Sequence, residues 1–205
     1  MFARAWAMRI DQISGNDING DGTPEVVFDG FTGGQGCCFV YTVVSLGKTP
    51  RLVREIHNQV PLHFRKAGDG SFEIRTGEGS FDLFLLPHSQ SVIPELTLRL
   101  RGTTLTDVSS DYREEYDARI SKAQSQLTPA ALEKFRDASV HKELFADQMP
   151  TVKLVLTIVL NYLYSGREPQ AWQTLDEMWP PSDTDRVRAL IQERRARGLL
   201  AHLAG

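Results

Sequence analysis

The chain has 205 residues and a mass of 23.0 kDa, and 41% of its residues are hydrophobic and 24% charged. This is the composition of a globular protein, long enough for one well-buried domain or two small ones. A formal net charge of -3 and a pI near 6.0 give no general attraction to nucleic acid, so no nucleic-acid partner is expected. The longest apolar run, Val152 to Tyr164, is shorter than the roughly 20 residues that span a bilayer, so no transmembrane helix is expected.

The beginning of the chain, MFARAWAMRIDQ, has neither the apolar region nor the small-residue cleavage site of a signal peptide. We therefore expect a cytoplasmic protein unless a leader is missing from the sequence. With a missing leader, the protein would be periplasmic or extracellular.

Short alternating segments separated by glycine, proline and aspartate fill the chain up to about Val108. β-Branched and aromatic residues in such segments predict strands. In the last of them, Leu96, Leu98 and Leu100 should face a core, and Arg99 should face water. The sequence predicts an antiparallel β domain over 1–108, blade-like or a sandwich, with strands at 25–31, 37–46, 51–60, 70–77, 80–86, 95–102 and after Gly102.

The hydrophobic period changes to three or four residues after Val108, which predicts helices. The first runs from Tyr112 to Leu127, and Thr128 should cap a second that starts at Pro129. Further helices are expected from Pro150 to Gly166, over 171–179 and from about 183. The sequence thus predicts a C-terminal helical bundle over 109–205 and an α+β fold class.

Three features of this half carry functional hypotheses. The apolar helix after Pro150 has one narrow polar stripe at every fourth position, which predicts that it is covered on most sides; the stripe is Lys153, Thr157, Asn161 and Ser165. The last helix is rich in arginine, which is typical either of a solvated face or of a surface that contacts a partner or a membrane. The terminal GLLAHLAG would be an association surface if it did not pack on its own domain.

An acidic loop precedes the first predicted strand of the β domain. Its side chains alternate in the way that a loop coiling around a hard cation requires, with a glycine for the sharp turn and a backbone carbonyl at the seventh position. The predicted ligands of Ca²⁺ are Asp17, Asn19, Asp21, Thr23 and Glu25. Phe28 at the twelfth position excludes an ordinary EF-hand. The alternative is an Asx-rich turn that holds no metal.

The segment DINGDGTPEVVF resembles the calcium loops of FG-GAP and VCBS repeats, which run straight into a hydrophobic strand. The wider stretch from Asp17 to Leu46 is similar to uncharacterised bacterial envelope proteins with a Gly-Gly-x-x-Cys-Cys segment after the loop. The resemblance implies that calcium stiffens the β domain without doing chemistry, and that the protein belongs to the cell envelope. TIVLNYLYSGREPQAWQTLDEMWP is, more weakly, similar to one tetratricopeptide unit.

Cys37 and Cys38 are the two cysteines and are adjacent, so they cannot close a loop of chain. They are either two thiols or, in an exported protein, a vicinal disulfide with strained geometry. No Cys-x-x-Cys motif supports a redox role.

The leading hypothesis is a non-enzymatic, calcium-stabilised interaction or scaffold protein of the cell envelope, with an unidentified protein partner. A second is a hydrolase that uses a carboxylate such as Asp29, or a cysteine with a histidine base; the histidine candidates are His57, His63 and His88. A third is a carbohydrate-binding module that uses Phe31 and Phe39 as an aromatic platform. No catalytic residue is assigned.

Overall fold

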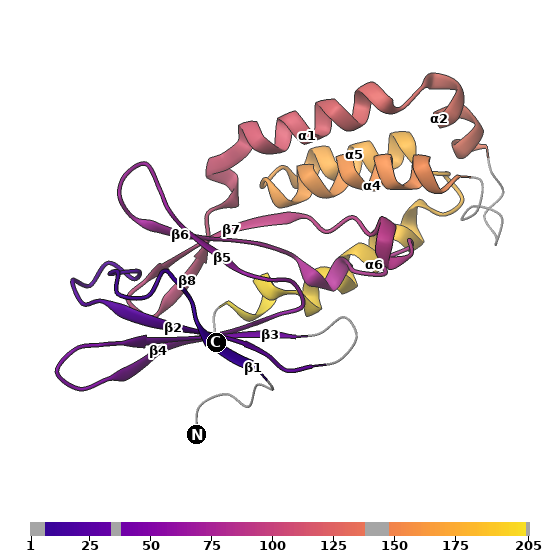
Figure 1. Cartoon of the computed structure of the whole chain (residues 1–205). Coiled ribbons are helices and arrows are strands. Elements are labelled where there is room, and N and C mark those ends of the chain that lie inside the picture. The colour runs from indigo at the N-terminus through magenta and orange to yellow at the C-terminus, as the bar shows by residue number, and fades with distance from the viewer. Residues whose placement is uncertain (1–6, 34–37, 138–147, 204–205) are drawn as a thin grey trace. The chain divides into compact units, whose positions relative to one another are not determined.

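The computed structural model describes residues 7–33, 38–137 and 148–203, and it has the predicted α+β fold class (Figure 1). The chain divides into two compact units. A β unit consists of Met1–Gly79, Glu95–Val108 and Gly198–Gly205, and a helical unit of Ser80–Pro94 and Ser109–Arg197. The predicted boundary after residue 108 is one of the points where the chain passes from the β unit to the helical unit. Two shorter segments belong to the unit on the other side of this boundary: Ser80–Pro94 to the helical unit and Gly198–Gly205 to the β unit.

The β unit contains two four-stranded antiparallel sheets, and in each the strands follow chain order (Figure 1). Each is an up-and-down meander. The connections from β1 to β2 and from β6 to β7 are long, and the second of them contains the segment Ser80–Pro94 of the helical unit. The first sheet contains β1 (Ala7–Ile10), β2 (Glu25–Phe31), β3 (Phe39–Ser45) and β4 (Arg51–Asn58). The second contains β5 (His63–Lys66), β6 (Phe72–Gly77), β7 (Glu95–Arg101) and β8 (Thr104–Asp107). The short strands β1 and β5 were not predicted, because four residues give little alternation to recognise.

The alternation in β7 has the predicted core face, since Leu96, Leu98 and Leu100 are buried. On the other face, Arg99 was predicted to face water. It is largely covered and donates from Nη2 to Glu73 Oε1 at 3.0 Å. Arg65 reaches the second oxygen of the same carboxylate at 3.2 Å. The fully buried Glu73 therefore lies between two arginines, which compensate the cost of burying its charge.

The strand predicted over residues 80–86 is wrong. The chain there forms the 3₁₀ turn η1 (Gly79–Phe81), and Leu83 and Leu85 have φ angles of 55° and 54°. A left-handed backbone breaks the extended conformation, so alternate side chains no longer fall on opposite faces. Phe81 and Phe84 instead pack edge to face, with ring centroids 5.2 Å apart, in the helical unit.

The helical unit contains five α-helices among its described residues (Figure 1). Thr128 accepts a hydrogen bond from Ala131 N at 3.2 Å and Pro129 opens the next helix, as predicted. Gly166 ends another helix with a φ of 77°, as its position predicted. The helices are α1 (Arg113–Gln126), α2 (Pro129–Arg136), α4 (Met149–Tyr164), α5 (Glu168–Met178) and α6 (Thr184–Arg197), with short 3₁₀ turns η2 (His88–Gln90) and η3 (Ser109–Tyr112).

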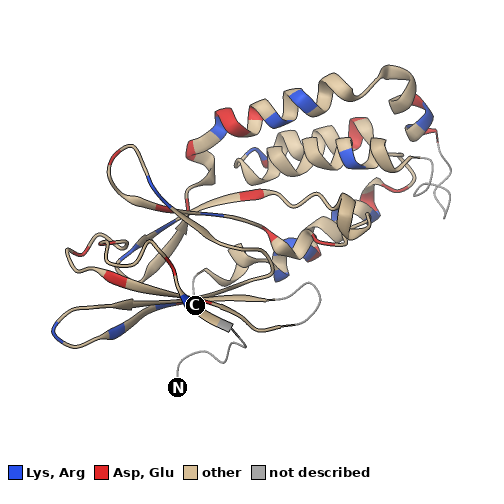
Figure 2. Cartoon of the chain, viewed as in Figure 1, with Lys and Arg blue, Asp and Glu red and all other residues tan. Residues whose placement is uncertain are grey.

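The arginines of α6 have partners within the helical unit. Four pair with carboxylates and Arg194 donates to Ser80 O at 2.9 Å. Figure 2 shows basic and acidic residues interspersed along this helix. The ion pairs are Arg186 with Asp183, Arg188 with Asp176, Arg195 with Glu168 and Arg197 with Glu193. The pairing reduces the charge that α6 offers to an anionic partner.

The chain after α6 packs on the β unit. Leu199 N and Leu200 N donate to the buried Glu78 carboxylate, at 2.8 and 3.3 Å, at the start of the 3₁₀ turn η4 (Leu199–His202). Arg54 of β4 donates to the carbonyl oxygen of Leu203 at 2.9 Å. The sequence predicted an association surface here only if the terminal segment did not pack on its own domain. Residues 199–203 do pack on their own unit, so this condition is not met for them.

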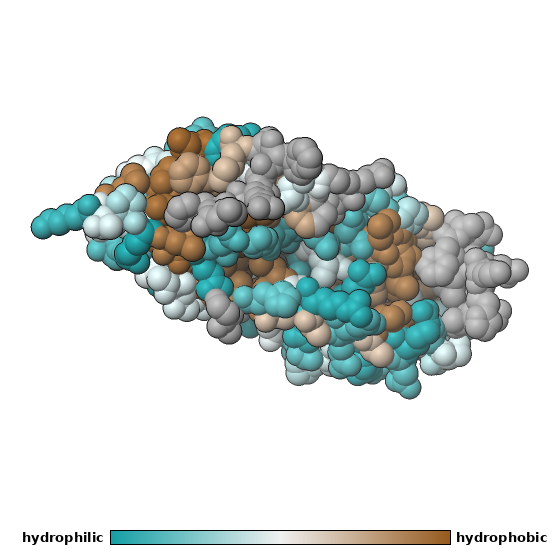
Figure 3. Space-filling view, turned by 90° about the horizontal axis from the view of Figure 1, so that it is seen from below, coloured by the Kyte–Doolittle hydropathy of each residue, from teal (hydrophilic) through white to brown (hydrophobic). Residues whose placement is uncertain are grey.

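One face of the first sheet carries hydrophobic side chains at the surface. Met8, Ile10 and Leu52 are 46%, 63% and 48% exposed. The strand register pairs Ile10 with Phe28, and Val26 with Val44, which in turn pairs with Leu52, so these residues share one face. Figure 3 shows hydrophobic residues at the surface of this part of the chain. We call these residues the apolar face of the first sheet: Met8, Ile10, Val26, Phe28, Val44 and Leu52.

A buried tyrosine joins the two sheets of the β unit. Tyr41 of β3 is 2% exposed, its hydroxyl accepts a hydrogen bond from Leu62 N at 3.0 Å, and its ring lies 6.1 Å from that of Phe64. We expect Tyr41→Phe to lower the free energy of unfolding by roughly 1–3 kcal/mol, because it leaves a buried amide without its acceptor. Urea denaturation measures this change. Tyr162→Phe in the partly exposed part of α4 is the control, and equal losses for both variants would contradict the assignment.

Candidate metal centre

The acidic loop is a closed turn between the first and second strands. Glu25 N donates to Asn16 O at 2.9 Å and Gly15 N donates to Glu25 O at 2.7 Å, which brings the two ends of the loop together. Gly102 N, in the turn between β7 and β8, donates to Asn19 O at 3.1 Å and ties the loop to the second sheet. Gly20 has a φ of 76°, a left-handed conformation that side chains rarely adopt, so this position favours glycine.

The loop is held in shape by its own carboxylates. Asp17 Oδ1 accepts hydrogen bonds from Gly20 N and Asp21 N at 2.8 and 3.0 Å, and its Oδ2 accepts one from Gly22 N at 2.9 Å. Asp21 Oδ1 accepts from Thr23 N at 2.9 Å. These hydrogen bonds gather the backbone around the side chains, and they leave one lone-pair site on Asp17 Oδ2 and one on Asp21 Oδ1.

Asn19 completes the middle of the loop. It is buried, its Oδ1 accepts from Asp21 N at 2.9 Å and its Nδ2 donates to Asp21 Oδ2 at 3.2 Å. The backbone amide of Asn19 also points inward, to the carboxylate of Glu25. Asn19 therefore fixes the positions of the Asp21 and Glu25 carboxylates.

Glu25 is the first residue of β2 and its side chain is fully buried beneath the loop. Its Oε2 accepts hydrogen bonds from Ile18 N at 2.7 Å and Asn19 N at 3.3 Å. Its Oε1 is buried and has no hydrogen-bond partner among the described residues. A buried carboxylate oxygen without a donor is costly, so it calls for either a proton or a cation.

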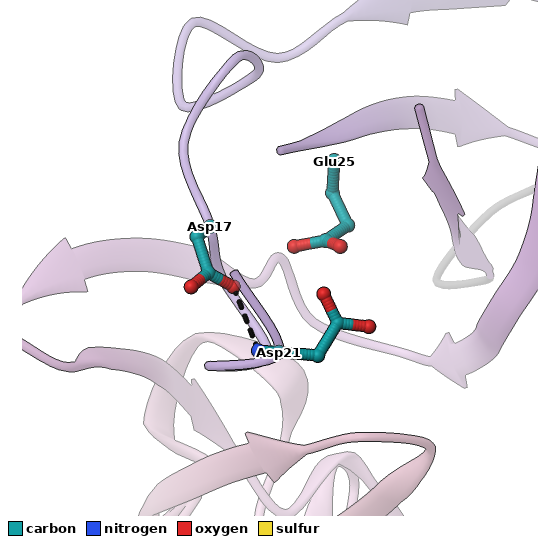
Figure 4. A group of neighbouring side chains, drawn as sticks. All are labelled: Asp17, Asp21 and Glu25. Carbon is teal, nitrogen blue, oxygen red and sulfur yellow. Dashed lines mark hydrogen bonds between the residues drawn. The ribbon is translucent and has the colours of Figure 1, made fainter. Parts of the chain in front are cut away.

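The structure brings three of the predicted ligands together. One carboxylate oxygen each from Asp17, Asp21 and Glu25 lies within 4.8 Å of the others. Figure 4 shows the three carboxylates facing a common space. Three carboxylates form an oxygen-only donor set, which suits a hard cation such as Ca²⁺ or Mg²⁺. The side-chain oxygen of Asn19, also a predicted ligand, accepts a hydrogen bond from Asp21 N. Thr23, predicted to offer its carbonyl, lies in the same turn, where its amide contacts Asp21.

The charges of the cluster are unevenly distributed. Burial raises the pKa of the Glu25 carboxyl, and the negative charges of Asp21 and Asp17 raise it further against the lowering effect of two amide hydrogen bonds. The hydrogen bond from the Thr23 amide lowers the pKa of Asp21, and so does nearby Arg51. Metal-free protein therefore holds a proton at Glu25 more readily than at Asp21, and a bound cation would displace it.

A basic residue that sequence reasoning missed contacts the cluster. Arg51 Nη2, at the start of β4, lies 2.8 Å from Asp21 Oδ2. It is 26 positions from the loop's last acid in sequence, and the antiparallel pairing of β2, β3 and β4 brings it there. Only the strand order could have revealed this contact.

The residues proposed for a hydrolase are distributed over both units. Asp29 is bound by Arg9 at 2.6 Å in a cleft of about 520 Å³ in the β unit, which His63 and Tyr41 also line. His57 Nε2 lies 2.5 Å from Glu55, and His88 of the helical unit lies 2.8 Å from Asp82. Arg9 contacts Oδ2 of Asp29 through both Nε and Nη2, so this carboxylate is part of an ion pair.

The two phenylalanines proposed as a sugar platform are in contact but not coplanar. The rings of Phe31 and Phe39 have centroids 5.2 Å apart and planes tilted by 48°. They form a tilted aromatic pair between neighbouring strands. This geometry differs from the flat platform that the carbohydrate-binding hypothesis requires.

The cysteine pair is described only in part, because Cys37 lies outside the described residues. Cys38 N donates to Thr32 Oγ1 at 3.3 Å, and Cys38 O accepts from Thr32 N at 3.1 Å, just before β3. The predicted vicinal disulfide therefore stays a prediction.

Comparison with protein-family models, with curated proteins and with solved structures finds no match for this chain. Its resemblance to FG-GAP and VCBS loops therefore depends on the loop itself. Among the described residues, no helix is both long and apolar enough to cross a membrane.

The pH dependence of stability tests the state of Glu25. In the presence of EDTA, the free energy of unfolding should fall as the pH rises above 4.5, the ordinary value of this carboxyl, because the folded protein keeps a proton that the unfolded chain releases. Glu25→Gln mimics the protonated form and should be more stable than the wild type at pH 7 by roughly 1–3 kcal/mol. The difference, measured by urea denaturation, should shrink toward pH 4.5. A difference that does not change with pH would contradict this assignment.

Proposed function

We propose that this protein is a calcium-stabilised, non-enzymatic interaction or scaffold module, in which the metal fixes the corner of a β unit that binds a protein partner. The observation that carries the proposal is Glu25, a buried carboxylate that lies with those of Asp17 and Asp21 around a common space (Figure 4) and whose Oε1 has no donor among the described residues. Calcium is favoured over magnesium because the donor set is irregular and rich in protein oxygens, whereas magnesium requires near-octahedral geometry and keeps several waters. The resemblance to FG-GAP loops supports the same choice.

A cation in this loop would connect separate parts of the β unit. Asp17 and Asp21 belong to the loop, Glu25 to β2, and the carbonyl of Asn19 is tied to the β7–β8 turn. Binding only to the folded form would stabilise the unit by mass action. This is a structural role and requires no nucleophile or acid-base pair at the metal.

The interaction part of the proposal is supported by the apolar face of the first sheet. Exposed hydrophobic residues that extend over several strands are typical of a protein contact surface. Met8, Ile10 and Leu52 supply the most exposed side chains. The loop and this face share β2, so a metal that holds the start of β2 would also hold the face in shape.

The envelope location is part of the same proposal and derives from the resemblance to bacterial envelope proteins. The free Ca²⁺ concentration outside the cytoplasm would suit loops of this kind, which in extracellular modules bind with dissociation constants of roughly 10⁻⁴–10⁻³ M. The hydrolase and carbohydrate-binding alternatives receive less support, because Arg9 occupies Asp29 and the Phe31–Phe39 pair is tilted.

Thermal unfolding with added calcium tests the metal. At a concentration 100 times the dissociation constant, Ca²⁺ should add about 2.7 kcal/mol and raise the melting temperature by roughly 5–10 °C. EDTA should reverse the shift, and Asp17→Asn should abolish most of it. Melting that is indifferent to both Ca²⁺ and EDTA would overturn the proposal.

The chain offers a matched control in its second Gly-Asp-Gly turn. Asp69 accepts hydrogen bonds from Ser71 N at 2.9 Å and Ser71 Oγ at 2.6 Å, and it lies outside the acidic cluster. Asp69→Asn should therefore leave the calcium response unchanged. If both aspartate variants lost the response equally, a general effect of charge would explain it.

Arg51 should compete with the metal for Asp21. Arg51→Gln removes a partly exposed ion pair, so we expect calcium affinity to increase about two- to fivefold. Isothermal titration calorimetry at fixed ionic strength measures the change, with Arg65→Gln, whose partner is Glu73, as the control. Weaker calcium binding by Arg51→Gln would show that the arginine supports the loop instead of opposing the metal.

A further inference from the structure

The helical unit contains a cavity of about 610 Å³ between α1 and α4, near η2. Its volume is in the range of roughly 300–1,000 Å³ that small-molecule sites occupy. The lining residues that the structure describes come from the last three turns of α1, the first three turns of α4 and Gln90 of η2. All of them belong to one compact unit.

The cavity accounts for the polar stripe on the most apolar helix of the chain. Lys153 and Thr157 both line it, and Asn161, one turn further along α4, is buried and donates to Thr157 O at 2.7 Å. The same helix buries Leu156 and Ile158 completely. The polar stripe predicted that α4 is covered on most sides. Two of its residues, Lys153 and Thr157, line the cavity instead.

The charges around the cavity have one sign. Arg119 and Lys122 of α1 and Lys153 of α4 line it, and its described lining residues include no carboxylate. Lys153 Nζ donates to the neutral Gln90 Oε1 at 3.0 Å, whereas Arg119 lies 3.6 Å from Glu115, one turn back on α1. In a protein with a formal net charge of -3, this cluster is a local reversal of sign that favours an anion.

Apart from Gln126, the remaining described lining is apolar. Ala123, Leu154, Met149 and Pro150 contribute hydrocarbon surface, and Ala123 belongs to a hydrophobic cluster with Ile120 and Ile158 against which Leu154 packs. Such a surface would leave the hydroxyls of a sugar or the oxygens of several phosphates without partners. It suits a ligand whose charge is confined to one end and whose remainder is hydrocarbon.

We infer that this cavity binds an amphiphilic carboxylate, an aliphatic chain with one anionic end, as a site separate from the metal loop. The carboxylate would lie between Lys153 and the basic residues of α1, and the chain would contact Leu154, Met149 and Ala123. Helix α4 also begins at the cavity, so its positive end adds to the attraction. The site does not depend on calcium.

Isothermal titration calorimetry of the full chain with decanoate, below its micelle concentration, tests the inference. We expect saturable binding of one molecule, unchanged by EDTA. Lys153→Gln should weaken it about tenfold because Lys153 is half-buried, and the exposed Lys122→Gln about two- to fivefold. Leu154→Trp, which fills the cavity, should abolish binding, while the exposed Lys134→Gln on α2 is the matched charge control.

Two ligand controls separate charge from hydrophobicity. Decyltrimethylammonium has the same chain with a positive end and should bind at least tenfold more weakly, and acetate, with the charge alone, should not saturate at millimolar concentration. Equal affinity for the cationic and anionic amphiphiles would overturn the inference, because it would indicate hydrophobic adsorption only. So would decanoate binding that Lys153→Gln and Lys122→Gln leave unchanged. Circular dichroism of each variant confirms that it is folded.

Discussion

The acidic corner of the β unit depends on one constraint, the burial of the Glu25 carboxylate at the first residue of β2. One of its oxygens holds the amides of Ile18 and Asn19, which draws the loop over the strand. The other oxygen has no donor in the part of the chain that the structure describes. A turn that only needed to reverse the chain would not require a fully buried acid, because Asn-Gly and Asp-Gly turns form without one. The position of Glu25 therefore favours a loop built around a cation.

The negative charges of the acidic loop are compensated only in part by residues of the protein. Asp17 and Asp21 already use several lone pairs to fix the loop, so their geometry does not depend on the metal. Glu25 differs, since its buried oxygen has no donor among the described residues, and a proton or a cation would satisfy it. Arg51 supplies part of the compensation, but at the exposed side of Asp21 and not at Glu25. The loop is thus preformed, and its remaining electrostatic cost is concentrated at a single oxygen.

The sequence predicted the elements with strong local signals. Alternation identified β7 with its buried leucines, and the Thr128–Pro129 cap and Gly166 marked helix ends that the structure confirms. It failed at residues 80–86, where a run of apolar residues resembles a strand but Leu83 and Leu85 have a left-handed backbone, and the segment belongs to the helical unit.

Contacts between distant residues were beyond the reach of pattern reasoning. The loop's ligands lie within nine residues of one another, so their spacing alone predicted the site. Arg51, the Arg9–Asp29 pair and the cavity between α1 and α4 depend on strand order and helix packing, which a single sequence does not specify.

The distribution of charge partners separates candidate sites from structural residues. Most functional candidates suggested by residue type are engaged inside their own unit: Asp29 by Arg9, His88 by Asp82, and the arginines of α6 by carboxylates or a carbonyl. These groups stabilise the fold and have little capacity left for a ligand. The acidic loop and the basic cavity differ from them, because each gathers charges of one sign around a space. Arg51 compensates part of the charge in the first place and Glu115 part of it in the second. A cation in the loop and an anion in the cavity would compensate the rest, and this is the physical argument for placing ligands there and not at the paired histidines.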